Sequence, residues 1–181
     1  IASKLGIELF VLDDGWFGDR NNDSAGLGDY RVNTKKLPGG IKRLAESIRK
    51  TGLDFGLWFE PEMVNKNSNL YREHPDWILS TPQRHETQSR NQHYLDLSRP
   101  EVAEYVYESV AKNLRQANIE YVKWDMNRTM TEVFSYGREA KRQKETWHRY
   151  FLGLYSVLER LVIEFPDVLF ESCASGGNRF D

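Results

Sequence analysis

The feature that most constrains the fold of this 181-residue chain is the alternation of short apolar runs with longer amphipathic stretches. The runs span residues 8–13, 55–59, 93–97, 121–125 and 168–171. Each run is rich in β-branched or aromatic residues, so each is predicted to form a strand. Strands that alternate with helices favour parallel βαβ units, each with a right-handed crossover.

The stretches between these runs predict three helices. Residues 40–50 carry apolar side chains at i, i+3, i+4 and i+7 from Ile41, which is a core-facing stripe. Ser98 and Glu101 have the spacing of a capping box at the start of the next helix. A third apolar stripe stops at Pro166 and contains Phe151, Leu154, Tyr155, Leu158, Leu161, Val162 and Phe165.

Two α/β architectures accommodate this alternation: an open doubly wound sheet and a (β/α)8 barrel of the TIM type. No Gly-x-Gly-x-x-Gly follows the first run, which weighs against a nucleotide-binding sheet. In a barrel, functional residues lie at the carboxyl ends of many strands. Such positions are occupied here by Asp13, Asp14, Glu60, Asp96, Asp125 and Cys173. The sequence therefore favours a partial barrel of about five βα units.

The composition excludes several classes of partner. The chain has 25 Lys and Arg against 27 Asp and Glu, a balance that provides no electrostatic footprint for nucleic acid. Its longest uncharged apolar run is far shorter than the roughly 20 residues that a membrane span needs. The single cysteine, Cys173, allows no internal disulfide and no cysteine metal cluster. We therefore expect no nucleic acid or membrane partner, and a cytoplasmic protein.

The segment from Lys123 to Asn127 carries the sharpest chemical signal. Side chains alternate along a strand, so Lys123, Asp125 and Asn127 are expected on one face. An ammonium group two residues from a carboxylate keeps that carboxylate ionised. A carboxylate of low pKa at a barrel mouth is a suitable nucleophile. The alternative interpretation of Asp125 is a strand-end salt bridge or a helix N-cap.

Several other side chains allow two interpretations each. Asp13 and Asp14 either cap the next turn or bind vicinal hydroxyls of a ligand. Trp58 either packs in the core or stacks on a sugar ring. Arg90 is a solvated loop charge or a clamp on ligand oxygens, and Cys173 begins a permissive loop that either approaches a ligand or turns the chain. Residue type alone also fits a carboxylate metal site made of Asp13, Asp14, Glu60, Glu62 and Asp125.

Taken together, these motifs resemble the catalytic barrel of glycoside hydrolase family 36, the microbial α-galactosidases. The resemblance covers essentially the whole chain, through residues 11–17, 28–30, 57–63, 90–92, 94–97, 121–128 and 170–173. It implies a retaining hydrolase of terminal α-linked galactose, acting by double displacement through a covalent galactosyl-enzyme. The implied substrates are α-galactoside oligosaccharides of the raffinose, melibiose and stachyose type. No cofactor and no metal are expected, and a homo-oligomer is expected.

The resemblance also assigns roles to individual positions. It makes Asp125 the catalytic nucleophile. Asp13 and Asp14 would bind the O4 and O6 hydroxyls of galactose, and Trp58 would form a wall of the pocket. The full set of substrate-binding positions that the resemblance implies is Asp13, Asp14, Trp58, Arg90, Lys123, Asn127, Cys173 and Gly176.

Parts of the family pattern have no counterpart in the sequence. The resemblance implies that residues 1–181 are part of one (β/α)8 catalytic domain and correspond to its strands two to six. The family's β-sandwich and C-terminal β-domain are expected to be absent. The family's acid/base aspartate follows beyond this segment, so Asp181 is not assigned that role. The alternative function is therefore a barrel fragment without an acid/base, which binds galactosides or is inactive.

Overall fold

A four-stranded parallel sheet forms the centre of the molecule. The structure is a computed structural model that describes residues 1–87, 89–174 and 179. The strands are β1 (Leu9–Leu12), β2 (Asp54–Phe59), β5 (Tyr121–Trp124) and β6 (Leu169–Ser172). They are parallel and lie side by side in the order β1-β2-β5-β6, which is also their order along the chain. A doubly wound sheet reverses its order at a switch point, and these four strands do not.

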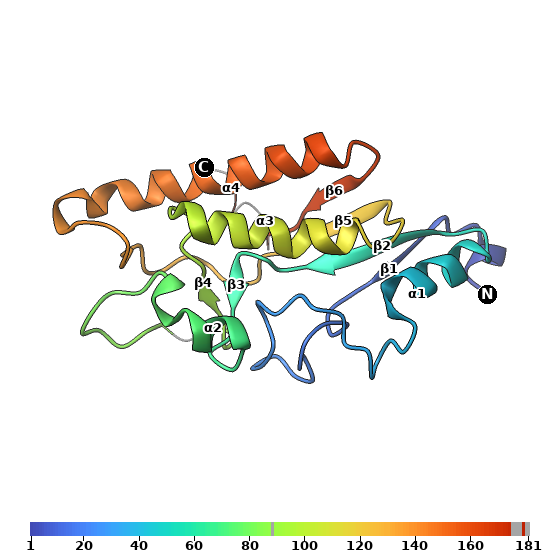
Figure 1. Ribbon diagram of the computed structural model, residues 1–181, viewed down its shortest axis with the longest axis horizontal. Helices are drawn as coiled ribbons and strands as arrows, with labels where there is room; N and C mark the ends of the chain where they lie inside the picture. The colour runs from blue at the N-terminus through green and yellow to red at the C-terminus, as the bar shows by residue number, and fades with distance from the viewer. Residues whose placement is uncertain (88, 175–178, 180–181) are drawn as a thin grey trace.

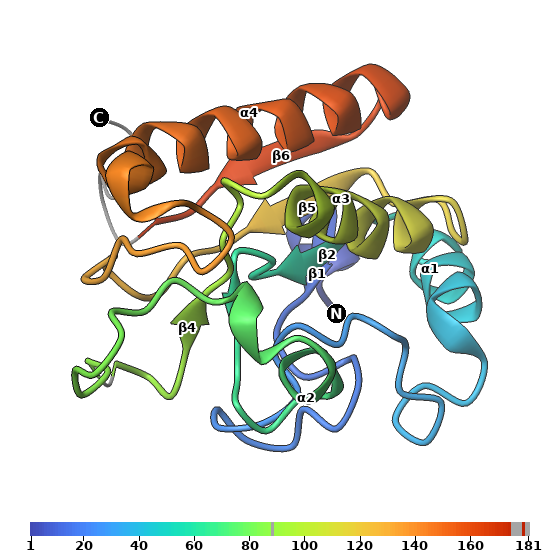
Figure 2. The same cartoon turned by 60° about the vertical axis from the view of Figure 1, so that its left-hand side comes forward.

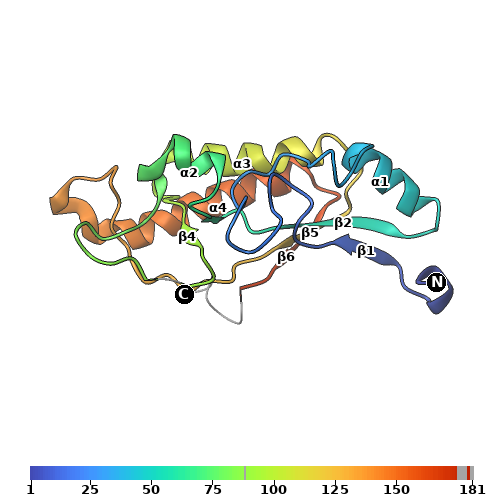
Figure 3. The same ribbon diagram turned by 90° about the horizontal axis from the view of Figure 1, so that it is seen from below.

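The helices lie on one face of this sheet, as Figure 3 shows. The three longer helices are α1 (Gly40–Arg49), α3 (Pro100–Leu114) and α4 (Thr146–Glu164), and α3 packs against α4 (Figures 1 and 2). Shorter elements are α2 (Asn69–Glu73) and the 3-10 turns η1 (Ser3–Leu5), η2 (Pro75–Trp77) and η3 (Ala140–Glu145). Because helices cover one face only, the two faces of the sheet carry different side chains.

The strand register sorts side chains between a covered face and an uncovered face. Leu57 pairs with Val122 across β2 and β5, and both side chains are fully buried in the core beneath the helices. The alternate positions, Gly56 and Tyr121, lie on the uncovered face. A Cβ at Gly56 would come within 3.0 Å of side-chain atoms of both Val11 and Tyr121, so the neighbouring strands leave no room for a side chain there.

The prediction that residues 93–97 form a strand of the parallel sheet is wrong. Only β4 (His93–Tyr94) is a strand, and it pairs antiparallel with β3 (Met63–Val64) in a separate two-stranded sheet. This small sheet lies beyond the carboxyl end of β2 (Figure 1). The described residues thus contain four parallel strands where the sequence predicted five. The α/β class is confirmed by the parallel sheet, and no described helix is long and apolar enough to cross a membrane.

The helix predictions hold in part. In α1, Ile41 and Ala45 are buried, as the pattern predicted, and the helix ends at Arg49. The capping box is wrong, because Arg99 is the N-cap residue of α3 and the Ser98 hydroxyl donates to Asp96 instead. In α4 the stripe is rotated from the predicted one. The buried apolar positions of α4 are Tyr150, Phe151, Leu154, Val157 and Leu161, whereas Tyr155 and Val162 are exposed.

Candidate active site

The predicted functional residues gather at the carboxyl edge of the parallel sheet. The chain leaves β1 at Asp13, β2 at Glu60, β5 at Asp125 and β6 at Cys173. Since carboxyl ends of parallel strands lie at one edge of a sheet, residues far apart in sequence meet there. Hydrogen bonds between these segments give the site its geometry.

Asp125 lies at the centre of this cluster and is 6% exposed. Its Oδ2 accepts hydrogen bonds from the indole Nε1 of Trp58 at 3.0 Å and from Nδ2 of Asn127 at 2.6 Å. Its Oδ1 accepts the backbone N–H of Met126 at 2.9 Å, and the side chain of Cys173 supplies a further hydrogen bond. The carboxylate is therefore held by a donor on β2 and by donors in the loops that follow β5 and β6.

These donors decide the charge of Asp125. Burial raises the pKa of its carboxyl, but the hydrogen bonds from Cys173, Asn127 and Trp58 outweigh burial, and the pKa lies below its ordinary value. The predicted ionised carboxylate is thus confirmed in direction; the hydrogen bonds are the main lowering causes, and the charge of Lys123 also interacts with Asp125. Lys123 pairs with Asp13 and makes no hydrogen bond to Asp125.

Lys123 and Asp13 join the ends of β5 and β1. The Lys123 Nζ donates to Oδ2 of Asp13 at 3.0 Å, and the two side chains are 28% and 61% exposed. This hydrogen bond raises the pKa of the Lys123 ammonium, so the lysine is cationic. Both groups share the uncovered face and are accessible enough to contact a ligand.

Asp14 is held differently from Asp13. Both of its oxygens accept from the guanidinium of Arg20, at 2.9 Å to Nε and 2.8 Å to Nη2. Arg20 is 4% exposed and also donates to the carbonyl of Ala25 and the side chain of Asn65. A bidentate guanidinium fixes both the position and the orientation of a carboxylate. Arg20 thus anchors Asp14, a role that nothing in the sequence pattern around it indicated.

Asn127 connects Asp125 to two further groups. Its backbone N–H donates to Oε1 of Glu60 at 2.6 Å, and its side-chain oxygen accepts from Arg90 at 3.4 Å. Glu60 also accepts from Nε2 of Gln92 at 2.9 Å. Arg90 has a positive φ of 52°, so the loop before β4 adopts a left-handed turn at this arginine. The structure therefore brings Arg90 and Asn127 together, as the site assignment requires.

Trp58 contributes its N–H rather than an open ring face. The side chain is 2% exposed, and its ring is nearly parallel to Phe17 at a centroid distance of 6.2 Å. Trp16 is equally buried and donates its own indole N–H to the carbonyl of Trp58. Both tryptophans therefore pack in the core, and Trp58 reaches the site as a hydrogen-bond donor to Asp125.

Cys173 belongs to the cluster, and Gly176 lies outside the described residues. The Cys173 N–H donates to the carbonyl of Trp124 at 2.9 Å, which continues the ladder between β5 and β6 by one residue. This bond brings the cysteine beside Asp125. Hydrogen bonds thus connect Asp125, Trp58, Asn127, Arg90 and Cys173, while Lys123 and Asp13 form a separate ion pair and Asp14 is bound mainly to Arg20.

The alternative carboxylate metal site finds no support in the described part of the chain. No group of three or more His, Cys, Asp or Glu side chains there is arranged to hold a metal ion. Glu60 and Glu62 are used in separate networks. Glu62 is fully buried and accepts from Trp124 Nε1 and Arg179 Nε, both at 2.9 Å, and from the hydroxyl of Tyr150.

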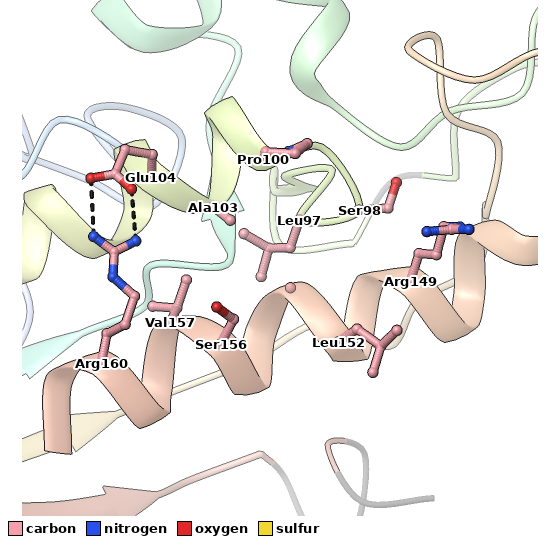
Figure 4. A pocket seen from close by; sticks show the side chains of 11 residues that line it. Leu97, Ser98, Pro100, Ala103, Glu104, Arg149, Leu152, Ser156, Val157 and Arg160 are labelled. Carbon is pink, nitrogen blue, oxygen red and sulfur yellow. Dashed lines mark hydrogen bonds and ion pairs between the residues drawn. The ribbon is translucent and has the colours of Figure 1, made fainter. Parts of the chain in front are cut away.

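A groove of about 350 Å³ between α3 and α4 is separate from this cluster (Figure 4). Residues from Leu97 to Glu104 line one side, and residues from Arg149 to Arg160 line the other. The guanidinium of Arg160 and the carboxylate of Glu104 form an ion pair at 2.6 Å across its end. None of the predicted site residues lines this groove, so it is a feature of the helical layer.

Comparison with known proteins identifies the family of this chain. The model of the family described as melibiase matches residues 1–181. Alpha-galactosidase AgaA of Geobacillus stearothermophilus is 55% identical over 180 residues, which are 99% of this chain and 25% of that protein. Alpha-galactosidase Mel36A of Lactobacillus acidophilus is 49% identical over 180 residues, which are again 99% of this chain and 25% of that protein. The chain therefore spans about a quarter of the length of these relatives.

The solved structures give the same result. The family 36 α-galactosidase AgaB of Geobacillus stearothermophilus superposes with a TM-score of 0.95 at 54% identity, covering 99% of this chain and 25% of that chain. A variant of AgaA in complex with raffinose also superposes at a TM-score of 0.95, again at 54% identity and with the same shares. The resemblance to family 36 that the motifs indicated is thereby confirmed, and the chain belongs to the melibiase family.

Proposed function

We propose that this chain is the nucleophile-bearing segment of an α-galactosidase that hydrolyses terminal α-galactosides. The observation that carries the proposal is the Asp125 carboxylate, held ionised by Trp58, Asn127 and Cys173 at the carboxyl edge of the sheet. Family membership and the names of the relatives support this reaction class. Raffinose and stachyose, which relatives hold in their solved structures, are the proposed substrate type.

The proposed mechanism is a double displacement with retention. The Asp125 carboxylate attacks the anomeric carbon while the glycosidic bond breaks and an acid protonates the leaving oxygen. Water then attacks the galactosyl–Asp125 ester, activated by the same group acting as a base, and free galactose leaves. That second carboxyl is proposed to lie outside these residues, within a (β/α)8 barrel to which this segment contributes. An ionised nucleophile is required from the start, and the hydrogen bonds to Asp125 provide it.

The proposed substrate contacts follow from exposure and charge. Asp13 and Lys123 are accessible and of opposite charge, so together they can accept from and donate to sugar hydroxyls. Arg90 and Asn127 would contact a ligand beside the nucleophile. Asp14, positioned by Arg20, would offer acceptors in a fixed direction.

Trapping of the covalent intermediate tests the proposal. The full-length enzyme is incubated with an activated 2-deoxy-2-fluoro-galactoside, digested and analysed by mass spectrometry of its peptides. A galactosyl label on Asp125 is the expected result. A label on any other residue refutes Asp125 as the nucleophile, and stoichiometric turnover without any labelled peptide refutes the covalent mechanism.

The proposed cellular and assembly state can be tested on the same protein. A homo-oligomer in the cytoplasm is the state that we propose for the enzyme. Light scattering after size exclusion measures the assembly, and fractionation of the cells that produce it measures the location. A monomer contradicts the proposed homo-oligomer, and activity found outside the cytoplasmic fraction contradicts the proposed location.

A further inference from the structure

Glu60 is a buried carboxyl beside the site to which the proposed mechanism gives no task. It follows the last residue of β2 and is 1% exposed. Its two oxygens accept from the backbone N–H of Asn127 and from the side chain of Gln92. Its own N–H donates to the hydroxyl of Tyr30 at 3.0 Å. Burying a carboxyl this deeply costs free energy unless hydrogen bonds compensate for the lost water, so the role of its contacts is of interest.

We propose that Glu60 is a positioning residue of the active site, which holds the backbone of Asn127 so that its side chain donates to Asp125. The inference rests on the proposed role of Asp125 as nucleophile. The link consists of two short hydrogen bonds in series, each of 2.6 Å: Asn127 N to Glu60 Oε1, and Asn127 Nδ2 to Asp125 Oδ2. Asn127 is therefore fixed at both ends between two carboxyls.

The charged and titratable surroundings of Glu60 fit this role. Burial is the main cause that raises the pKa of its carboxyl to about 7, and the charge of Asp125 adds to it. Below that pH the carboxyl is neutral, can still accept from Asn127, and places no second negative charge beside Asp125. The groups from neighbouring elements that interact electrostatically with Glu60 are Arg20, Tyr30, Arg90, Tyr94 and Asp125.

Glu62 provides a matched comparison within the same segment. It is as buried as Glu60 and lies two residues further along the chain. Its acceptors bind Trp124, Tyr150 and Arg179, and none of these three contacts is with Asn127 or the carboxylate of Asp125. If both glutamates only stabilised the fold, replacing Glu60 or Glu62 would have the same effect on the ionisation of Asp125. Positioning through Asn127 makes them different.

The test is the pH dependence of kcat/KM for the full-length enzyme on an activated aryl α-galactoside. The acidic limb of this profile reports the ionisation of the free enzyme's nucleophile. Glu60→Ala removes the acceptor for Asn127, so the limb is expected to move up by about one pH unit, with a loss of about tenfold or more in kcat. Glu60→Gln retains an acceptor for the Asn127 N–H, so its limb is expected at the wild-type position.

Two further variants keep the test decisive. Glu60→Met fills a similar space without an acceptor, so it serves as the test if Glu60→Ala does not fold. It is expected to move the acidic limb by the same amount. Glu62→Gln is expected to lower the melting temperature and leave the limb in place. A limb that stays at the wild-type position in Glu60→Ala or Glu60→Met overturns the inference. So does an equal shift in Glu62→Gln.

Failure of the inference can be told from failure of the proposed function. The same enzyme preparation is labelled with the fluorinated galactoside. A label on Asp125 together with an unmoved limb refutes the role of Glu60 alone. A label on another residue refutes the nucleophile, and the Glu60 inference falls with it.

Discussion

The two faces of the parallel sheet differ in what their side chains do. Beneath the helices, Leu57 and Val122 are fully buried and apolar. On the opposite face, Lys123 pairs with Asp13, and the hydroxyl of Tyr121 donates to Glu171. Strand β5 contributes to both sets by simple alternation, with Val122 on one face and Tyr121 and Lys123 on the other. The covered face holds the apolar packing and the uncovered face carries the proposed site, so a substitution on each face is expected to disturb a different property.

The largest expected effect is at the end of the uncovered face. Asp125→Asn in the full-length enzyme removes the proposed nucleophile, so kcat on α-galactosides is expected to fall on the order of 10⁴-fold or more. Steady-state assays measure kcat, and circular dichroism confirms that the variant is folded. A folded variant with activity within tenfold of wild type would show that the carboxylate of Asp125 is not the reacting group.

A cavity beneath the helices is expected to change stability instead. Leu57→Ala removes a buried side chain that packs beside Val122, so the free energy of unfolding is expected to fall by about 2–5 kcal/mol. Denaturant unfolding measures this loss, and kcat per folded molecule is expected to stay near wild type. If kcat falls more than stability does, the two faces are not separable in this way.

A smaller effect is expected at Asp14. Asp14→Ala removes a carboxylate that Arg20 fixes in place, so we expect galactose affinity and kcat/KM to weaken together by about 10–100-fold. Calorimetry with galactose and steady-state kinetics measure the two quantities. Asp19→Ala, an exposed aspartate in the same loop, is the control. Unchanged affinity and turnover in Asp14→Ala would remove Asp14 from the substrate site.

The last comparison is a pH dependence of stability from Glu60, which directly follows β2. Its pKa in the folded protein is about 7, above the ordinary value of 4.5. The neutral carboxyl therefore favours folding, and this contribution is lost as pH rises from about 4.5 through about 7. The free energy of unfolding of wild type minus that of Glu60→Gln should decline across this window. A difference that is constant with pH would place the pKa of Glu60 at its ordinary value.

The periodic parts of the sequence predicted most of the fold. Four of the five apolar runs became parallel strands, because β-branched and aromatic residues fit a buried pleated surface. The run at residues 93–97 carries the same signal but joins β3 instead. Local composition predicts extended backbone, whereas the choice of partner strand depends on how the loop after Glu60 returns to the sheet.

The positions of site residues that directly follow a strand were predictable from the sequence. The contacts between segments far apart in the sequence were not. Asp13, Asp125 and Cys173 follow strands directly, so their convergence followed from a parallel sheet. The ion pair of Lys123 with Asp13 rather than with Asp125 depends on β1 and β5 lying on either side of β2. Arg20 had no signal at all, since an arginine in a polar loop is most often solvated.

The strand order described above also bears on how the chain folds during synthesis. β2 pairs with β1, β5 with β2, and β6 with β5, so each of these three later strands pairs with a strand that has already been synthesised. Synthesis at about 5–20 residues per second is slow compared with the closure of a short loop. A growing chain can therefore extend its sheet from the amino end, one strand at a time. We expect the pairing of β2 with β5 to be the slowest of the three, because the segment between them is long and holds β3, α2, η2, β4 and α3.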